Sequence, residues 1–149
     1  MFLALENIIP LKAAYVKEKD ESDLIPYFKR VTLTFGIPVV LIVLVLSYYD
    51  EVLIGLIFGE NLGDYGFVIG AFAILYLLVY VNTMQQFFIR TIKANQIVFK
   101  SYLAAALFGV LFSKMMVEYW GVVGVLVGLF ISQLMVNAIN YALIKKVLK

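Results

Sequence analysis

Polar side chains inside an apolar stretch are the residues of this chain best suited to recognise a ligand. The stretch from Tyr65 to Ile89 has no charged residue, yet amides and then basic residues follow one another from its second half onward at spacings of three and four: Asn82, Gln85, Gln86, Arg90 and Lys93. Such spacings place side chains on one face of a helix. A guanidinium can bind a phosphate group through two parallel hydrogen bonds. This polar stripe is therefore the leading candidate for a functional site.

A second set of polar residues lies in the last apolar stretch, which runs from 121 to 144. One face carries amides, Gln133, Asn137 and Asn140, and the roughly opposite face carries small residues at intervals of four, Gly124, Gly128 and Ser132. Small residues let a neighbouring helix approach closely, and we expect the closest approach at Gly128. The amides serve either as hydrogen-bonding contacts between helices or as contacts to a ligand.

The apolar stretches that carry these residues have the length and composition of membrane spans. Of 149 residues, 64% are hydrophobic and 15% charged, with a mean hydropathy of +0.98, whereas ordinary globular chains carry about 25% charged residues. A helix covering the uncharged stretch from Tyr65 to Ile89 would be roughly 37 Å long, and the hydrocarbon core of a bilayer is about 30 Å thick. The sequence predicts an all-α membrane protein.

The pattern of charges divides the chain into two regions. Residues 1–30 are expected to form a partial helix and a polar loop, and residues 31–149 a four-span region with spans at about 31–49, 65–92, 97–113 and 121–144. The first helix is either an interfacial helix or the tail of a span whose beginning is missing, which would make the chain a fragment.

Four local features complete the expected layout. Ser22 or Asp23 could cap the helix that follows, and Pro38 should kink its span, as a packing feature or as a gating hinge. The apolar run 52–58 is too short to cross a bilayer and should lie at the interface, and 59–64 has the composition of a turn.

Basic residues set the expected orientation. In a four-span arrangement, eleven of the twelve basic residues fall on one side, and the connection 50–64 on the other side carries four acids and no base. The positive-inside rule assigns the basic side to the cytoplasm. Tyrosines and the tryptophan that mark the opposite ends of the spans agree with this assignment: Tyr48, Tyr49, Tyr65, Tyr119 and Trp120. We expect a multi-pass membrane protein with both termini in the cytoplasm.

Composition also argues against several classes of function. The chain has no cysteine and no histidine, so the usual zinc ligands, a thiol nucleophile and imidazole acid–base chemistry are absent. All ten acids lie outside the predicted spans, so a proton-coupled exporter with a carboxylate in mid-membrane is disfavoured. No catalytic residues, metal site, cofactor or nucleic-acid partner is expected, and we expect no enzymatic activity.

Short motifs along nearly the whole chain resemble one transporter family. They are IIPLKAAYVKEKD before a charged loop, a proline-bearing span after FKR, the segment LIGLIFGENLGDYG, and YWGVVGVLVG at the start of the last span. Between them, IRTIKANQ is a basic connection. The order of these features resembles the C-terminal part of the polysaccharide, or lipid-linked oligosaccharide, flippases of the multidrug/oligosaccharidyl-lipid/polysaccharide exporter superfamily.

The resemblance implies that these spans are part of a six-helix lobe of a larger transporter, whose N-terminal lobe this chain lacks. It further implies a polyprenyl-diphosphate-linked oligosaccharide as substrate, with membrane lipid around the protein. The implied substrate cavity would take its contacts from Arg90, Asn82, Gln86, Gln133 and Asn137, and Lys93 and Lys100 would stand at its cytoplasmic mouth. The alternative for the three basic residues is an ordinary anchor to headgroups, and the alternative function is a small four-span accessory or scaffold protein of cell-envelope glycan synthesis.

Overall fold

A computed structural model describes residues 2–59 and 65–147, and nearly all of them are helical. The elements in chain order are α1 (Phe2–Lys19), the short 3-10 helix η1 (Glu21–Asp23), α2 (Leu24–Tyr48), α3 (Asp50–Phe58), α4 (Gly66–Thr91) and α5 (Gln96–Val147). Within the described residues, α2, α4 and α5 are long and apolar enough to cross a membrane. The all-α class predicted from the sequence is therefore confirmed, whereas three such helices stand where the sequence predicted four spans.

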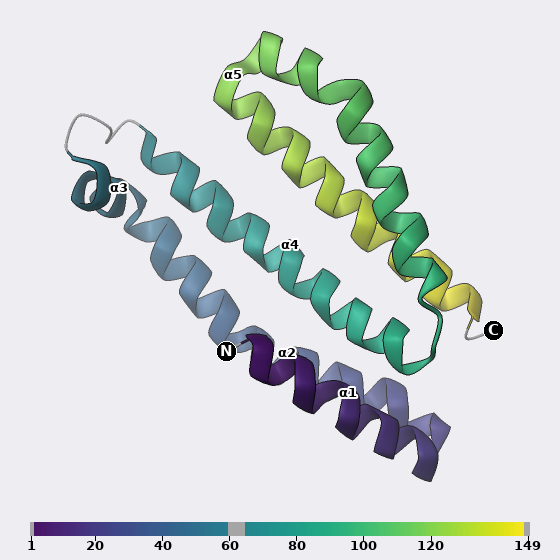
Figure 1. Ribbon diagram of the computed structural model, residues 1–149. Helices are drawn as coiled ribbons and strands as arrows, with labels where there is room; N and C mark the ends of the chain where they lie inside the picture. Colours follow the sequence, from purple (N-terminus) through teal and green to yellow (C-terminus); the bar gives the residue numbers. More distant parts are fainter. Residues whose placement is uncertain (1, 60–64, 148–149) are drawn as a thin grey trace.

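The helix α5 folds back on itself at a single glycine. Gly121 has φ 54° and ψ −130°, a conformation open to glycine and strongly unfavourable for other residues. Figure 1 shows the two resulting halves running side by side in opposite directions, here called α5a (96–120) and α5b (122–147). The sequence predicted a connection between 113 and 121, and the structure instead continues the helix to Trp120. No residue of that segment breaks a helix, and Glu118 pairs with Lys114 one turn away at 3.7 Å.

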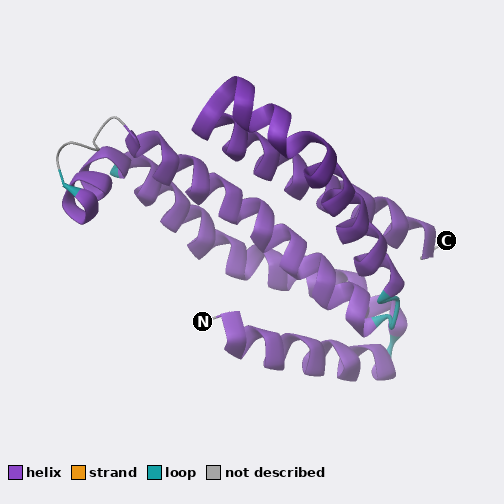
Figure 2. Cartoon of the chain, turned by 45° about the horizontal axis from the view of Figure 1, so that its top comes forward, coloured by secondary structure: helices purple, strands orange, loops and turns teal. Residues whose placement is uncertain are grey.

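The central element is α4, which contacts α1, α2, α3 and α5. Figure 2 shows the helices lying alongside one another with short loops between them. Ten of its residues are buried, and it is the most buried of the three long helices. The mean hydropathy of the α4 sequence would not reveal this burial, because an apolar helix surface can face either lipid or protein.

The largest buried cluster lies where α1 and the start of α2 pack against α4. Ile9 and Ala13 of α1 are buried there beside Phe28 of α2, and the Phe28 ring meets the Phe88 ring of α4 edge to face at 5.2 Å. Helix α2 begins at Leu24, directly after the two residues predicted to cap it and seven residues before the predicted span at 31. The helix must extend that far for Leu24 and Phe28 to reach the core.

Neither of the two predicted caps closes the start of α2. Asp23 is the N-cap residue, but its side chain makes no capping hydrogen bond. The turn is instead held by Asp20, whose Oδ1 accepts a hydrogen bond from the Ser22 N–H at 2.8 Å. That hydrogen bond stabilises the charged form and lowers the pKa of the Asp20 carboxyl.

The middle of α2 is fastened to α4 by a buried tyrosine. The Tyr80 hydroxyl donates to the Thr32 carbonyl oxygen at 2.6 Å, and the ring packs over Gly36. Pro38 lies two residues farther on, in a helix that remains one element from Leu24 to Tyr48. The kink expected at Pro38 stays a prediction.

The predicted interfacial run 52–58 is part of a separate short helix. This helix, α3, packs against the beginning of α4, where Gly66 approaches the backbone of Glu51. The predicted turn 59–64 begins at Gly59, which has φ 94°. Its remaining residues lie outside the described part of the chain.

The small-residue ridge of α5b (Gly124, Gly128, Ser132) faces α5a, its own hairpin partner. A Cβ on Gly124 would lie 2.6 Å from the carbonyl carbon of Met116 and closer still to its oxygen. At Gly128 the nearest atom is the flexible Met116 Sδ, 3.3 Å from an added Cβ, and Ser132 lines a small cavity of about 180 Å³. The expectation of closest approach at Gly128 was wrong, because the helices diverge as they leave the reversal at Gly121.

We expect Gly124→Ala to destabilise the hairpin by about 2 kcal/mol or more, because its methyl group collides with backbone that cannot move without displacing α5a. Gly128→Ala is the matched control and should cost less than about 1 kcal/mol, because the Met116 side chain can rotate. Unfolding of the purified protein by denaturing detergent measures both. Equal loss of stability in the two variants would contradict this geometry.

Candidate functional site

Buried amides join α4 to both halves of α5. Asn82 of α4 is 2% exposed, and its Oδ1 accepts a hydrogen bond from the Nδ2 of the fully buried Asn140 in α5b at 3.1 Å. The Asn82 Nδ2 donates to the Tyr102 hydroxyl of α5a at 2.8 Å, and the Gln86 Nε2 donates to the same hydroxyl at 2.8 Å. Three helical segments therefore meet at one amide.

A second group of amides lies on the side of α4 that faces α5b. The Asn137 Nδ2 donates to the Leu78 carbonyl oxygen at 3.1 Å and to the Gln133 carbonyl oxygen at 2.9 Å. The Gln85 Nε2 returns a longer hydrogen bond, 3.4 Å, to the Asn137 carbonyl oxygen. The contacts with Leu78 and Gln85 cross between α4 and α5b, so the predicted stripe of α4 divides between two partner segments.

Several amide oxygens of this interface are buried and accept no hydrogen bond from the described residues. They are Gln85 Oε1, Gln133 Oε1, Asn137 Oδ1 and Asn140 Oδ1. A buried polar atom without a partner costs roughly 1–3 kcal/mol. The amide cluster, defined as Asn82, Gln85, Gln86, Gln133, Asn137 and Asn140 with Tyr102, is thus only partly satisfied and keeps acceptor capacity.

The basic residues of the predicted stripe lie outside this cluster. Arg90 is exposed in the last turn of α4, where a cation interacts favourably with the helix dipole. Lys100 is exposed near the start of α5. Both positions are at the end of the bundle where α4 passes into α5, and Arg90 is one turn beyond Gln86 along α4.

Lys93 is not on the helical face that the spacing predicted, because α4 ends at Thr91. Lys93 has a left-handed φ of 58°, its N–H donates to the Arg90 carbonyl oxygen, and the Ala94 N–H donates to the Ile89 carbonyl oxygen, both at 3.0 Å. This pair of hydrogen bonds is a Schellman motif, in which the left-handed position is usually glycine. The lysine therefore closes the helix, and the stripe ends at Arg90.

Two tyrosines inside the helices were missed as functional positions. Tyr102 accepts the hydrogen bonds of two amides, and the hydroxyl of the buried Tyr80 fastens α4 to α2. Tyrosines at span ends mark the membrane interface, but a tyrosine within an apolar stretch needs a partner for its hydroxyl. Their positions well inside the predicted spans were the signal that could have identified them.

The cluster contains amide and hydroxyl groups and no ionisable side chain apart from tyrosine, so it can donate and accept hydrogen bonds but offers no general acid or base near neutral pH. Within the described residues, no three acidic, histidine or cysteine side chains gather in a way that could hold a metal ion.

Comparison with family models, curated proteins and solved structures finds no match to this chain.

The cluster predicts energetic coupling between Asn82 and Asn140. Each single substitution to Ala breaks the same hydrogen bond, so the double variant should be more stable than the sum of the single losses implies, by about 1 kcal/mol. Detergent unfolding of the four proteins in the cycle measures this coupling. Strict additivity would show that the two amides do not interact.

Proposed function

We propose that this chain is the membrane-embedded segment of a flippase that moves lipid-linked oligosaccharides across the inner membrane during surface polysaccharide synthesis. The observation that carries the proposal is the partly satisfied amide cluster between α4 and α5. Polar groups within membrane spans are expensive and tend to mark the path of a substrate. Amide oxygens that keep acceptor capacity can accept hydrogen bonds from the hydroxyl groups of a sugar.

The proposed arrangement has four crossings, with α2 and α4 contributing one each and α5 two. Its halves α5a and α5b are each long enough to span about 30 Å of hydrocarbon. In Figure 1 the start of α2, the end of α4 and both ends of α5 gather at one end of the bundle, which is the basic end. The positive-inside rule then places this end, with the C-terminal end of α5b, in the cytoplasm. The start of α1 lies away from this end in Figure 1, because α1 runs toward it.

Transport would require the N-terminal lobe that the family resemblance implies. Movement of α5 relative to α4 would open the amide cluster to a central cavity, and a substrate that binds the open state better shifts the equilibrium toward it. Arg90 lies one turn beyond Gln86, toward the basic end. A guanidinium there would suit the diphosphate of a polyprenyl-linked substrate, with Lys93 and Lys100 nearby at the mouth.

The competing proposal is a small accessory or scaffold protein that assembles through its small-residue ridge. In the structure Gly124 and Gly128 contact Met116 of the same chain, so the ridge is used within the hairpin. This observation favours the transporter over an assembly that depends on the ridge.

Arg90 provides the test that separates a transporter from a scaffold. In the complete transporter, Arg90→Lys should preserve insertion and abundance but reduce export severalfold, because an ammonium group lacks the planar fork of a guanidinium. Arg90→Ala should reduce export further. Complementation of surface polysaccharide, with membrane protein levels measured in parallel, provides the readout.

The matched control is Lys146→Ala, which removes another exposed charge at the same end of the bundle. Its effect should be smaller than that of Arg90→Ala. Full complementation by both Arg90 variants at normal abundance would contradict a role of Arg90 in substrate binding. It would show that this charge serves only to orient the protein in the membrane.

A further inference from the structure

A groove of about 780 Å³ runs along the surface at the basic end of the bundle. Its walls are the first half of α2 and the end of α5b, and its floor is α4. Among the described residues α2 and α5 do not pack against each other, so the two walls stay apart and leave the floor uncovered. The groove is formed by helices that stand on either side of α4.

Hydrocarbon-like side chains make up most of the lining. Met84 and Phe88 on the floor are buried, Val81 lies on the floor at one end, and Leu33 and Ile144 belong to the two walls. On α2 the lining runs from Ile25 to Leu33, a rise of about 12 Å. One leaflet of the hydrocarbon core is about 15 Å deep. The groove therefore has the depth and surface chemistry for a lipid chain in the cytoplasmic leaflet of the proposed arrangement.

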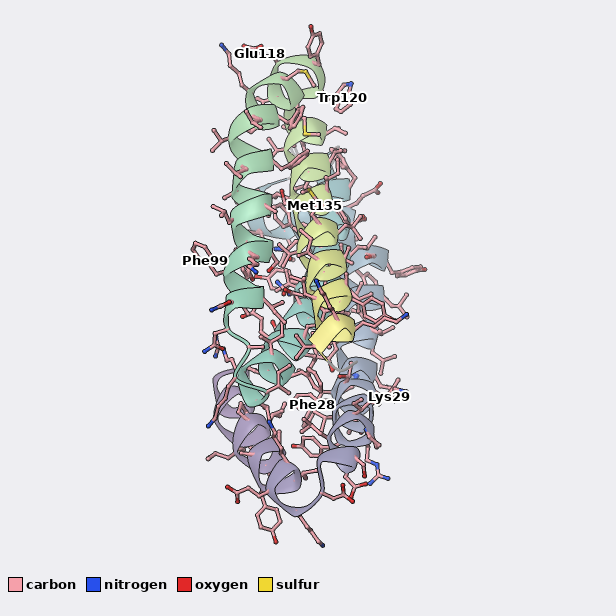
Figure 3. All side chains as sticks on the ribbon, turned by 90° about the vertical axis from the view of Figure 1, so that its right-hand side faces the viewer. Phe28, Lys29, Phe99, Glu118, Trp120 and Met135 are labelled. Carbon is pink, nitrogen blue, oxygen red and sulfur yellow. The ribbon has the colours of Figure 1, made fainter. Side chains whose placement is uncertain are left out.

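Two ammonium groups from different helices stand at this groove. Lys29 of α2 and Lys145 of α5b both line it, and no carboxylate is among the residues that do. Figure 3 shows Lys29 and Phe28 toward the end of the bundle opposite Glu118 and Trp120. Lysines at this level place their ammonium groups among lipid headgroups, where they attract phosphate.

We propose that the groove binds one anionic phospholipid of the bilayer, with a hydrocarbon chain on the α4 floor and the phosphate between Lys29 and Lys145. The charge of the groove selects this occupant. An apolar helix, from a second copy or from another protein, would cover the floor but leave the two lysines without a counter-charge. A phospholipid matches both the apolar floor and the positive end.

The proposal is tested by native mass spectrometry of the delipidated protein titrated with phosphatidylglycerol or, separately, phosphatidylcholine. The variant is Lys29→Ala combined with Lys145→Ala. The matched control is Arg30→Ala combined with Lys146→Ala, which removes the same charge from the adjacent positions, neither of which lines the groove. Each ammonium group should contribute about fivefold to anionic lipid binding, so the variant should bind phosphatidylglycerol about twenty-five-fold more weakly. The control should change binding less than about threefold.

A second variant tests the apolar floor. Val81→Trp places a bulky ring in the groove and should weaken the binding of both lipids, whereas Val110→Trp, on an exposed position of α5a, should weaken neither. Equal losses of phosphatidylglycerol binding in the Lys29/Lys145 variant and in the Arg30/Lys146 control would show diffuse attraction to the basic end and overturn the proposal. Equal affinity of the wild-type protein for the two lipids, or a dimer in place of a lipid adduct, would also overturn it.

Discussion

The hydrogen bonds that Asn82 makes to Asn140 and Tyr102 are the constraint on which the arrangement of α5 depends. In a membrane, apolar surfaces gain little by choosing protein over lipid, so packing and interhelical hydrogen bonds decide which helices associate. The amide of Asn82 has a donor and an acceptor group, and it uses them on α5a and α5b respectively. One side chain thereby fixes both halves of the hairpin against the central helix.

The same amides that hold the helices together also give the protein its candidate site. Interhelical contacts that are fully satisfied would make a rigid structure, whereas this cluster retains buried oxygens without donors, including those of Gln133 and Asn137. A partly satisfied polar interface in a membrane is marginally stable and can exchange partners. This property is consistent with a helix pair that opens to bind a polar substrate.

The all-helical class and the presence of long apolar helices could be predicted from the sequence because both depend on local composition. The predicted number of four spans differs from the three long apolar helices of the described chain, because the last two predicted spans lie in the single helix α5. The bounds of α4 lie within one residue of the predicted 65–92 at each end. The stripe on α4 was predicted from periodicity alone, but periodicity cannot state which segment each residue meets. Gln86 contacts α5a and Gln85 contacts α5b, a division that depends on the position of α5 around α4.

Other predictions failed where a single backbone position decided the outcome. The reversal of α5 occurs at Gly121, whose φ and ψ no apolar-periodicity pattern reveals. Lys93 leaves the predicted helical face because it has a left-handed φ just beyond the end of α4, a conformation usually reserved for glycine. The sequence placed Gly121 and Lys93 next to connections between helices, but it did not reveal the backbone conformation of either residue.

The central claim is that α5 crosses the membrane twice, so that its reversal lies on the face opposite the basic end. The chain has no cysteine, so single cysteines at Glu118 and Ser22 can be labelled without a competing thiol. In intact cells an impermeant thiol reagent should modify Glu118→Cys, next to the reversal, and should leave Ser22→Cys unmodified until the membrane is opened. Labelling of both or of neither in intact cells, or of Ser22→Cys alone, would contradict the two-crossing hairpin in the orientation proposed.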